Sequence, residues 1–135
     1  MKGENMECLI EYCGKRKFKA GMNGFEVITD LPERVGGEDS AMSPTQLFIS
    51  SIGACMGLYA VRYLKTAGLD PSGLSVRLDW DFSDDKTRVG RIDATIKVPN
   101  AELGARKKAV IAAAKKCTLH GTLKEAPEMN TVIEE

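Results

Sequence analysis

The sequence predicts an α+β fold in which helices pack on antiparallel sheet. Strand-like alternation comes in neighbouring segments, and helical patterns separate these groups instead of following each strand in turn. This order of meander, helix, hairpin, second helix and final strand lacks the regular spacing of a parallel βαβ fold. A chain of 135 residues is long enough to bury one ordinary core, so we expect a single domain over residues 1–135.

The N-terminal segments predict a small antiparallel meander. Apolar and polar residues alternate over residues 6–12, as in a half-buried strand. Gly14 interrupts this pattern before a candidate second strand over residues 16–20. A turn at residues 21–24 then leads into a third strand over residues 25–29. Three strands joined by short turns are the simplest interpretation.

Residues 30–42 are predicted to form a loop, because they have no hydrophobic period and include Pro32, Gly36 and Gly37. Loops of this length inside a compact domain are usually functional or mobile. Since the loop leads directly into the next helix, it could cover whatever that helix presents. A plain surface crossover remains the alternative.

A long central helix is predicted over residues 43–66. Ser43 is a candidate N-cap, Pro44 suits the first helical position, and Gln46 stands three residues after the cap, as in a capping box. Gly68 is a candidate left-handed stop. Between these signals apolar residues fall on every face, which is typical of a buried helix.

This helix also needs to be compared with a membrane span. Its uncharged part, residues 43–61, approaches the length that a spanning helix needs. Serine and glutamine side chains interrupt it, and nothing else in the sequence resembles a membrane protein, so we expect a core helix and no membrane partner. Gly53 and Gly57, spaced as in G-x-x-x-G, are expected to let another backbone come close.

A β-hairpin with one apolar face is predicted after the helix. Residues 74–82 and 92–98 alternate between apolar and polar side chains, and a turn-rich segment joins them. The apolar face is expected to pack on the central helix. Asn100 is a candidate cap for a second helix over about residues 101–116, and residues 129–133 are expected to form the final strand.

Charge and composition narrow the classes of function. The chain carries 19 basic and 19 acidic residues, a balance that argues against nucleic acid as the main partner and offers no basic stripe for anionic lipid. The N-terminus lacks the apolar core of a secretory signal. We therefore expect a cytoplasmic protein whose cysteines are mostly reduced.

Four cysteines and one histidine carry most of the chemical reactivity of this chain. Cys8 lies on the apolar face of the first strand and is predicted to fill the core, whereas Cys13 has no assigned role. Cys55 stands in mid-helix between glycines, and Cys117 is expected at the exposed end of the second helix, three residues before His120. These residues alone leave three interpretations open: core packing, half of a zinc site, or the catalytic pair of a Cys–His hydrolase. No second pair of ligands lies near Cys55, so we expect neither a metal nor another cofactor.

Two motifs resemble the osmotically inducible protein C / organic hydroperoxide resistance (OsmC/Ohr) family. They are PTQLFISSIGAC, which ends at Cys55, and KCTLHGTL, which contains Cys117. The resemblance extends from the first meander to the last strand and implies an intertwined, OsmC-like homodimer with active sites at the interface. It also implies a thiol peroxidase of oxidative-stress defence that reduces organic hydroperoxides and is restored by a dithiol reductant. Cys55 would be the peroxidatic thiol and Cys117 the resolving one.

The supporting residues depart from the pattern of the active family members. Those members pair an arginine of the first sheet with a glutamate just after the helix-initiating proline, where this chain has Thr45. Arg16 and Arg34 are the candidates for the arginine, and Gln46 and His120 are further candidates to support the thiols. We therefore expect a weakly activated Cys55 and slow turnover. The alternative function is a non-peroxidase dimer of the same OsmC-like fold that binds an apolar ligand at the thiol pocket.

Overall fold

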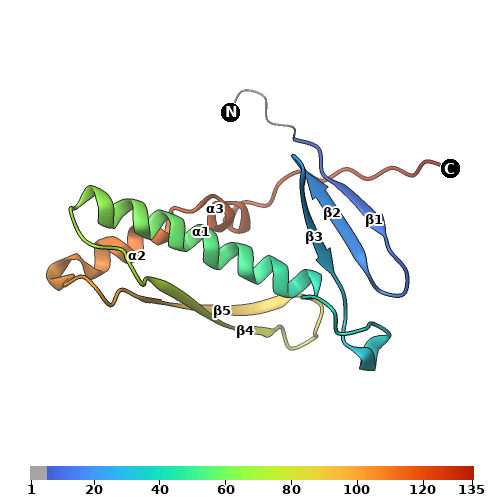
Figure 1. Ribbon diagram of the computed structural model, residues 1–135, viewed down its shortest axis with the longest axis horizontal. Coiled ribbons are helices and arrows are strands. Elements are labelled where there is room, and N and C mark those ends of the chain that lie inside the picture. Colours follow the sequence, from blue (N-terminus) through green and yellow to red (C-terminus); the bar gives the residue numbers. More distant parts are fainter. Residues whose placement is uncertain (1–5) are drawn as a thin grey trace. The chain divides into compact units, whose positions relative to one another are not determined.

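The computed structural model describes residues 6–135, and the chain forms two compact units, Met1–Ser50 and Ser51–Glu135. The first unit contains a three-stranded antiparallel sheet in the order β1-β2-β3 (Figure 1). Its strands are β1 (Leu9–Tyr12), β2 (Phe18–Met22) and β3 (Phe25–Thr29). The predicted meander is confirmed, although β1 begins later than residue 6 and β2 is displaced toward the C-terminus from residues 16–20.

The turn between β2 and β3 explains this displacement. Asn23 and Gly24 have positive φ angles of 51° and 83°, as the central pair of a two-residue hairpin turn requires. Gly21 and Met22 are therefore free to pair with Glu26 and Phe25 within the sheet. The sequence predicted a longer turn at residues 21–24 because Gly21 reads as a turn residue when its pairing partner is unknown.

The loop that follows β3 is held together by one buried carboxylate. Asp30 is 0% exposed and accepts hydrogen bonds from the backbone N–H groups of Leu31 (2.8 Å), Glu38 (3.2 Å) and Ser40 (3.1 Å). The Ser40 hydroxyl donates a fourth bond to Asp30. This hydroxyl bond, together with the backbone donors, holds the pKa of Asp30 down at about 2, well below its ordinary value. A short 3₁₀ turn, η1 (Glu33–Val35), occupies the middle of the loop.

The long helix α1 (Pro44–Thr66) confirms the prediction at both of its ends. The Gln46 N–H donates to Ser43 Oγ (3.1 Å), and the Ser43 N–H donates back to Gln46 Oε1 (2.9 Å), which completes the capping box. At the other end Gly68 has a φ of 73°, and the Leu69 N–H donates to the Leu64 carbonyl (2.8 Å). This is the hydrogen-bond pattern of a Schellman stop.

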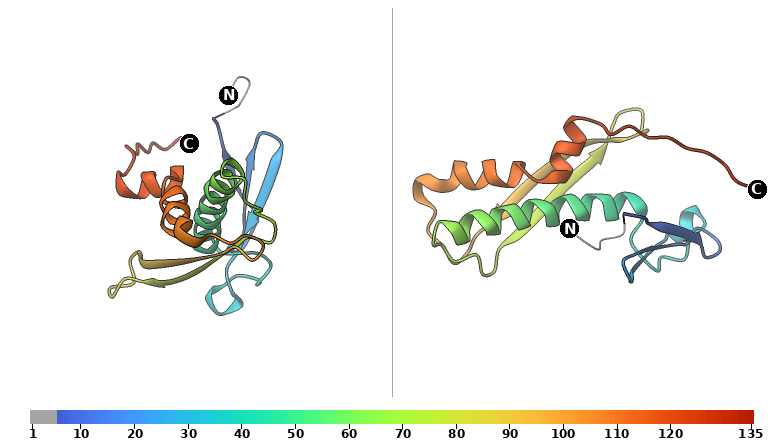
Figure 2. Two further views of the ribbon diagram at one scale, coloured as in Figure 1. Left: turned by 90° about the vertical axis from the view of Figure 1, so that its left-hand side faces the viewer. Right: turned by 90° about the horizontal axis from the view of Figure 1, so that it is seen from above.

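The second unit packs a hairpin and two shorter helices on α1. The hairpin strands pair in antiparallel register, with Leu78 opposite Ala94 and a bulge near Phe82. The elements are β4 (Ser75–Phe82), β5 (Val89–Lys97), the 3₁₀ turn η2 (Gly104–Arg106), α2 (Lys107–Lys115) and α3 (Thr118–Lys124). Both views of Figure 2 show α2 beside α1. Antiparallel sheet with packed helices confirms the predicted α+β class.

One stripe of α1 forms the core of the second unit. Ile52, Met56, Ala60 and Leu64 are each less than 9% exposed and pack in a cluster that includes Val110 of α2. The other side of the helix is open in the single chain, where the Leu58 side chain is 57% exposed. The prediction that α1 is buried on every face is therefore wrong for a single chain. The hairpin and α2 cover only part of the helix circumference.

The two glycines of α1 make room for side chains of β4. A Cβ atom on Gly53 would lie 2.9 Å from Cδ1 of Leu78, and one on Gly57 would lie 3.5 Å from Cγ2 of Val76. The close approach predicted for another backbone is thus made by aliphatic side chains of the hairpin. Among the described residues, α1 is also the one helix long and apolar enough to cross a membrane, which is equally true of many core helices.

The C-terminal third differs most from its prediction. The Asn100 side chain donates to the Ser72 carbonyl (2.9 Å) instead of capping a helix, and α2 begins only at Lys107. Helix α3 was not predicted. The final strand predicted at residues 129–133 is absent from the described structure, where residues 125–135 form neither helix nor strand. Among residues 6–135 no strand pairs with this segment, although its alternating pattern suits pairing.

The core stripe predicts a large stability loss for Ile52→Asn. The side chain is 3% exposed, so the substitution removes packing and leaves an amide without a partner. We expect the free energy of unfolding to fall by about 3 kcal/mol or more in urea denaturation. Ile133→Asn is the matched control, since Ile133 is 91% exposed and its change is expected to stay within about 0.5 kcal/mol. Equal unfolding midpoints for the two variants would contradict this assignment of the core.

The Asp30 carboxylate predicts a specific acid sensitivity. Because its pKa is lower in the folded chain than in the unfolded chain, its stabilising contribution is present above about pH 4 and is lost as pH falls toward about 2. Asp30→Asn should lower the melting temperature at pH 7 and flatten its dependence on pH between those limits. Asp84→Asn, at an exposed position of the β4–β5 turn, is the control and should retain the wild-type pH profile.

Candidate thiol site

The structure brings two of the four cysteines together. Cys55, in the middle of α1, packs against the core cluster that contains Cys117, and it is near enough to raise the pKa of the Cys117 thiol. Cys8 and Cys13 lie in the first unit and are both exposed. The prediction that Cys8 fills the core is wrong for this chain, because Cys8 precedes β1 and its side chain is not covered.

Cys117 occupies the junction between α2 and α3. Its backbone is extended (φ −61°, ψ 146°), which ends one helix and lets the next begin at Thr118. Its sulfur accepts the backbone N–H of His120 at 3.2 Å and so acts as the N-cap of α3. The side chain is 1% exposed, so the expectation of an exposed helix end is wrong. The thiol is buried because it belongs to the same cluster as Ile52 and Met56 of α1.

Burial dominates the electrostatics of Cys117. Removal from water raises the pKa of this thiol above its ordinary value, and the neighbouring Cys55 raises it further. The His120 N–H opposes both effects by donating to the sulfur, yet the net direction is upward. Cys117 is therefore held as a neutral thiol at physiological pH.

A polar contact lies on the Cys55 side of α1, one helical turn further along. The Tyr59 hydroxyl is 3.3 Å from Oγ1 of Thr118, the residue directly after Cys117. The guanidinium of Arg62 lies over the Tyr59 ring, 4.9 Å from its centroid, in a cation–π arrangement. Sequence reasoning missed Tyr59 and Thr118. The i, i+4 spacing of Cys55 and Tyr59 was the available signal, but only the fold shows that α3 begins beside it.

The four candidate supporting residues are divided between the two units. Arg16 lies against the loop, since a Cβ on Gly36 would be 3.1 Å from Arg16 Nε, and Arg34 is exposed on η1. The Gln46 side chain is engaged in the helix cap. His120 is in the second unit, where its backbone contacts Cys117. Of these four candidates, His120 contacts a thiol, and it does so through its backbone N–H to the Cys117 sulfur.

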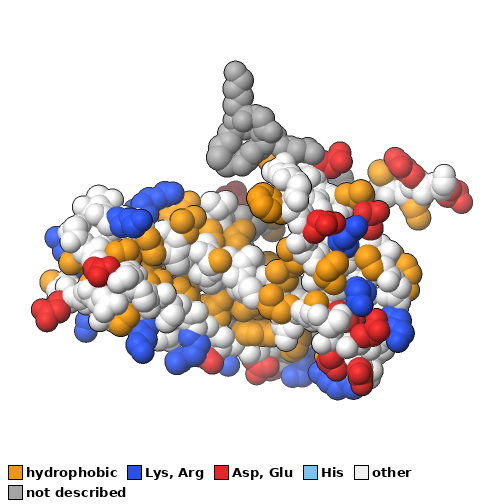
Figure 3. Space-filling view, viewed as in Figure 1, with side chains coloured by type: hydrophobic (Ala, Val, Ile, Leu, Met, Phe, Trp, Pro, Cys, Tyr) orange, Lys and Arg blue, Asp and Glu red, His pale blue; other side chains and the backbone are white. Residues whose placement is uncertain are grey.

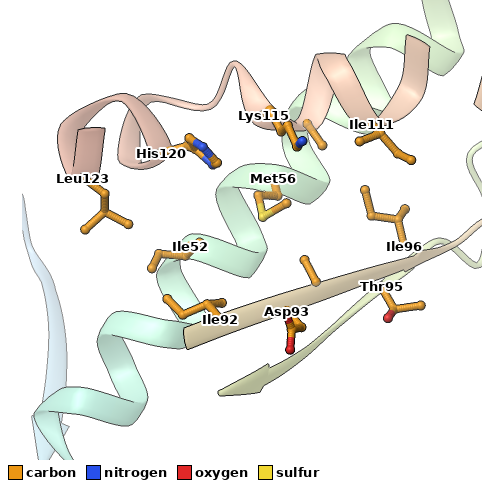
Figure 4. Close-up of a pocket in the computed structure, with 12 residues that line it drawn as sticks. Ile52, Met56, Ile92, Asp93, Thr95, Ile96, Ile111, Lys115, His120 and Leu123 are labelled. Atoms are coloured by element: carbon orange, nitrogen blue, oxygen red, sulfur yellow. The ribbon is translucent and has the colours of Figure 1, made fainter. Parts of the chain in front are cut away.

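A cavity of about 540 Å³ lies beside the thiol pair, between α1, β5, α2 and α3 (Figure 4). Its walls are mainly apolar, and His120, Lys115 and Asp93 are among the residues that line it. Neither Cys55 nor Cys117 lines this cavity. Ile52 and Met56 line the cavity and also belong to the core cluster that contains Cys117, so the apolar space adjoins the core of the thiols without being lined by them.

The arrangement of these side chains also bears on the interpretation of Cys117 and His120 as half of a zinc site. Within residues 6–135 no three side chains of His, Cys, Asp or Glu gather closely enough to hold a metal ion. His120 approaches Cys117 through its backbone N–H and not through its ring. The residues of this motif are thus arranged as a helix cap, which is not a metal-ligand geometry.

Solved structures with the same fold include three bacterial proteins. A protein of Psychrobacter arcticus, provisionally named an osmotic stress induced and detoxification response protein, is 22% identical, with 90% of this chain and 91% of that chain covered and a TM-score of 0.79. An OsmC-like protein of Mycoplasma pneumoniae is 17% identical, with 92% and 90% covered and a TM-score of 0.73. An organic hydroperoxide resistance protein of Elizabethkingia anophelis is 17% identical, with 93% of each chain covered and a TM-score of 0.64. These likenesses establish the fold.

The family assignment comes from the sequence itself. No curated protein matches the chain. Residues 37–132, however, match the family described as OsmC-like protein. This range holds the helix cap at Ser43, both interacting thiols and the cavity. The match covers well over half of the chain, and the fold agrees with it, so this chain belongs to the OsmC-like protein family.

Proposed function

We propose that this chain is a thiol-dependent peroxidase that reduces organic hydroperoxides in defence against oxidative stress. Cys55 is the attacking thiol and Cys117 the resolving thiol. The observation that carries the proposal is that Cys55 of α1 packs against the same core cluster that contains Cys117, at the start of α3. Family membership supports it, as do neighbours named as organic hydroperoxide resistance proteins from Legionella pneumophila and Elizabethkingia anophelis.

The proposed reaction takes place in two balanced steps. The Cys55 thiolate attacks the terminal oxygen of ROOH, the O–O bond breaks, and the alkoxide takes up a proton to leave as ROH. Cys55 is then a sulfenic acid. Cys117 attacks its sulfur and forms a disulfide, and the sulfenic oxygen leaves as water with the proton of Cys117. A dithiol reductant restores both thiols and is itself oxidised to a disulfide.

The surroundings of Cys117 slow the second step. Its raised pKa lowers the fraction of thiolate, which is the form that attacks the sulfenic acid. Activation of Cys55 requires a cationic or hydrogen-bonding group. Tyr59, which Arg62 covers on one ring face, is the nearest polar arrangement one turn away along the helix. With Thr45 in place of the family glutamate, this supports slow turnover.

We further propose that the chain acts as a cytoplasmic homodimer. Apolar side chains remain exposed in both units: Phe25 by 79%, Leu9 by 60% and Leu58 by 57%. Figure 3 shows hydrophobic side chains spread over the visible faces of both units. Patches of this kind usually mark a protein interface. A cytoplasmic location would also supply the dithiol reductant that the reaction consumes.

A second function is a non-peroxidase, ligand-binding dimer of the same fold. The cavity of the second unit favours it, because its walls are mainly apolar. In this alternative the thiols stay reduced and serve as core side chains. The two functions differ in whether Cys55 reacts with peroxide.

The peroxidase proposal predicts distinct products for single cysteine variants. Reduced wild-type protein given one equivalent of cumene hydroperoxide should form a Cys55–Cys117 disulfide, detected by peptide mapping. Cys55→Ser should abolish peroxide consumption, and Cys117→Ser should consume one equivalent and leave Cys55 as a sulfenic acid or higher oxide. The exposed Cys8→Ser and Cys13→Ser variants are the controls and should retain turnover. Unreacted Cys55 in the wild type would instead favour the ligand-binding dimer.

The dimer proposal predicts a sedimenting species of two chains, each of 14.7 kDa, at micromolar concentration. An obligate apolar interface of this kind is expected to bury more than about 2,000 Å² in total. Unfolding should accordingly depend on protein concentration, because dissociation and unfolding are then coupled. A monomer at micromolar concentration would reject the proposal.

A further inference from the structure

The cavity of the second unit has the lining of a small-molecule site. Its volume of about 540 Å³ falls within the range of roughly 300–1,000 Å³ that is typical of ligand pockets. Ile92 and Ile96 of β5 form one wall, and Ile52 and Met56 of α1 form another. Figure 4 shows these side chains directed into a common space. An occupant therefore needs an apolar body.

The polar groups of the cavity gather on the side of α2 and α3. Lys115, in the last turn of α2, and His120, in the first turn of α3, both line it across from Ile92 (Figure 4). Within residues 6–135 Lys115 forms no ion pair with an acidic side chain. A lysine at such an edge can lay its methylene stem on the apolar wall and keep its ammonium group in water.

The one acidic residue at the cavity does not cancel this charge. Asp93 alternates with Ile92 along β5, so its side chain belongs to the opposite face of the strand. There it forms an ion pair with Arg91. The uncompensated charge that remains beside the apolar space is the positive charge of Lys115. An anionic head group is thus the complementary partner.

We propose that this cavity binds an unbranched aliphatic carboxylate. The hydrocarbon chain lies between the isoleucines of β5 and the side chains of Ile52 and Met56. The carboxylate lies at Lys115, with the His120 ring as a second polar contact. An alkyl chain gains free energy from leaving water in proportion to its buried area, and the carboxylate keeps a charged donor.

The site is separate from the proposed thiol chemistry, although α3 connects the two. Neither thiol lines the cavity, so binding does not require a reactive Cys55. His120, however, lines the cavity and also donates its backbone N–H to the Cys117 sulfur. A ligand that contacts the His120 ring would therefore touch the residue whose backbone N–H binds the Cys117 sulfur, the N-cap of α3.

The chain offers a direct reporter for this proposal. His120 is the only histidine, so its imidazole signals in a proton–carbon NMR spectrum can be assigned without ambiguity. Titration with sodium decanoate, below its micelle-forming concentration, should shift these signals saturably with a Kd below about 1 mM. Decanol should bind more weakly, and butyrate should not produce a saturable shift. The experiment uses reduced wild-type protein and Cys55→Ser in parallel, so that a failure of the peroxidase proposal leaves this test intact.

Two variants test the two parts of the site. Lys115→Gln should weaken decanoate binding by about fivefold and leave decanol binding unchanged, as expected for a partly exposed charge contact. Lys116→Gln is the matched control, since the neighbouring lysine is exposed and does not line the cavity. Ala94→Phe places a ring in the space from β5 and should weaken both ligands.

Three results would overturn the proposal. The first is a titration in which the His120 signals do not move, which would mean that a second copy of the chain or other side chains fill the cavity in solution. The second is equal loss of decanoate binding in Lys115→Gln and Lys116→Gln, which would indicate non-specific attraction. The third is equal affinity for decanol and decanoate that Lys115→Gln leaves unchanged. If Ala94→Phe fails to fold, the comparison of Lys115→Gln with Lys116→Gln and the NMR titration of the wild type still test the proposal.

Discussion

Ile52, Met56, Ala60 and Leu64 recur every four residues along α1, and α1 buries this stripe in a cluster with Val110 and Ala114 of α2. Each fully buried side chain of the size of isoleucine, leucine or methionine contributes about 1.5–3 kcal/mol. The glycines of the same helix let β4 side chains pack closely on it. The hairpin strand β5 and the segment that begins α3 pack against the same cluster through Ile92, Ile96 and Leu119.

The same contact determines the chemistry that is available to the thiols. Because Cys55 lies in the middle of α1 and packs against the cluster that contains Cys117, both cysteines belong to one core. Burial raises the pKa of the Cys117 thiol, so its thiolate form needs help from nearby polar groups. Helix α3 connects the thiols with the cavity. Its N-cap is the Cys117 sulfur, and His120 in its first turn lines the cavity.

Interactions between residues close in the sequence were predictable from the sequence, whereas interactions between distant segments were not. The bounds of α1 were predictable because Ser43, Gln46 and Gly68 make their hydrogen bonds within a few residues of themselves. The hairpin was predictable because its alternation repeats on both strands. The start of the second helix was missed because the Asn100 amide bonds to Ser72, 28 residues away, instead of capping its own segment. Helix α3 was missed because a thiol is an unusual cap and Gly121 weakens the helical pattern.

The sequence by itself determined the α+β class, the central helix with both of its caps and the motifs around Cys55 and Cys117 that point to the OsmC-like family. These features depend on residue order over short distances, where hydrogen bonding and hydrophobic periodicity act directly. Only the tertiary structure decided that Cys55 packs against the cluster of Cys117, that Cys117 is buried and that a cavity with Lys115 and His120 lies in the same unit. Each of those features requires segments far apart in the chain to share one packed surface, and no local pattern records which surfaces will meet.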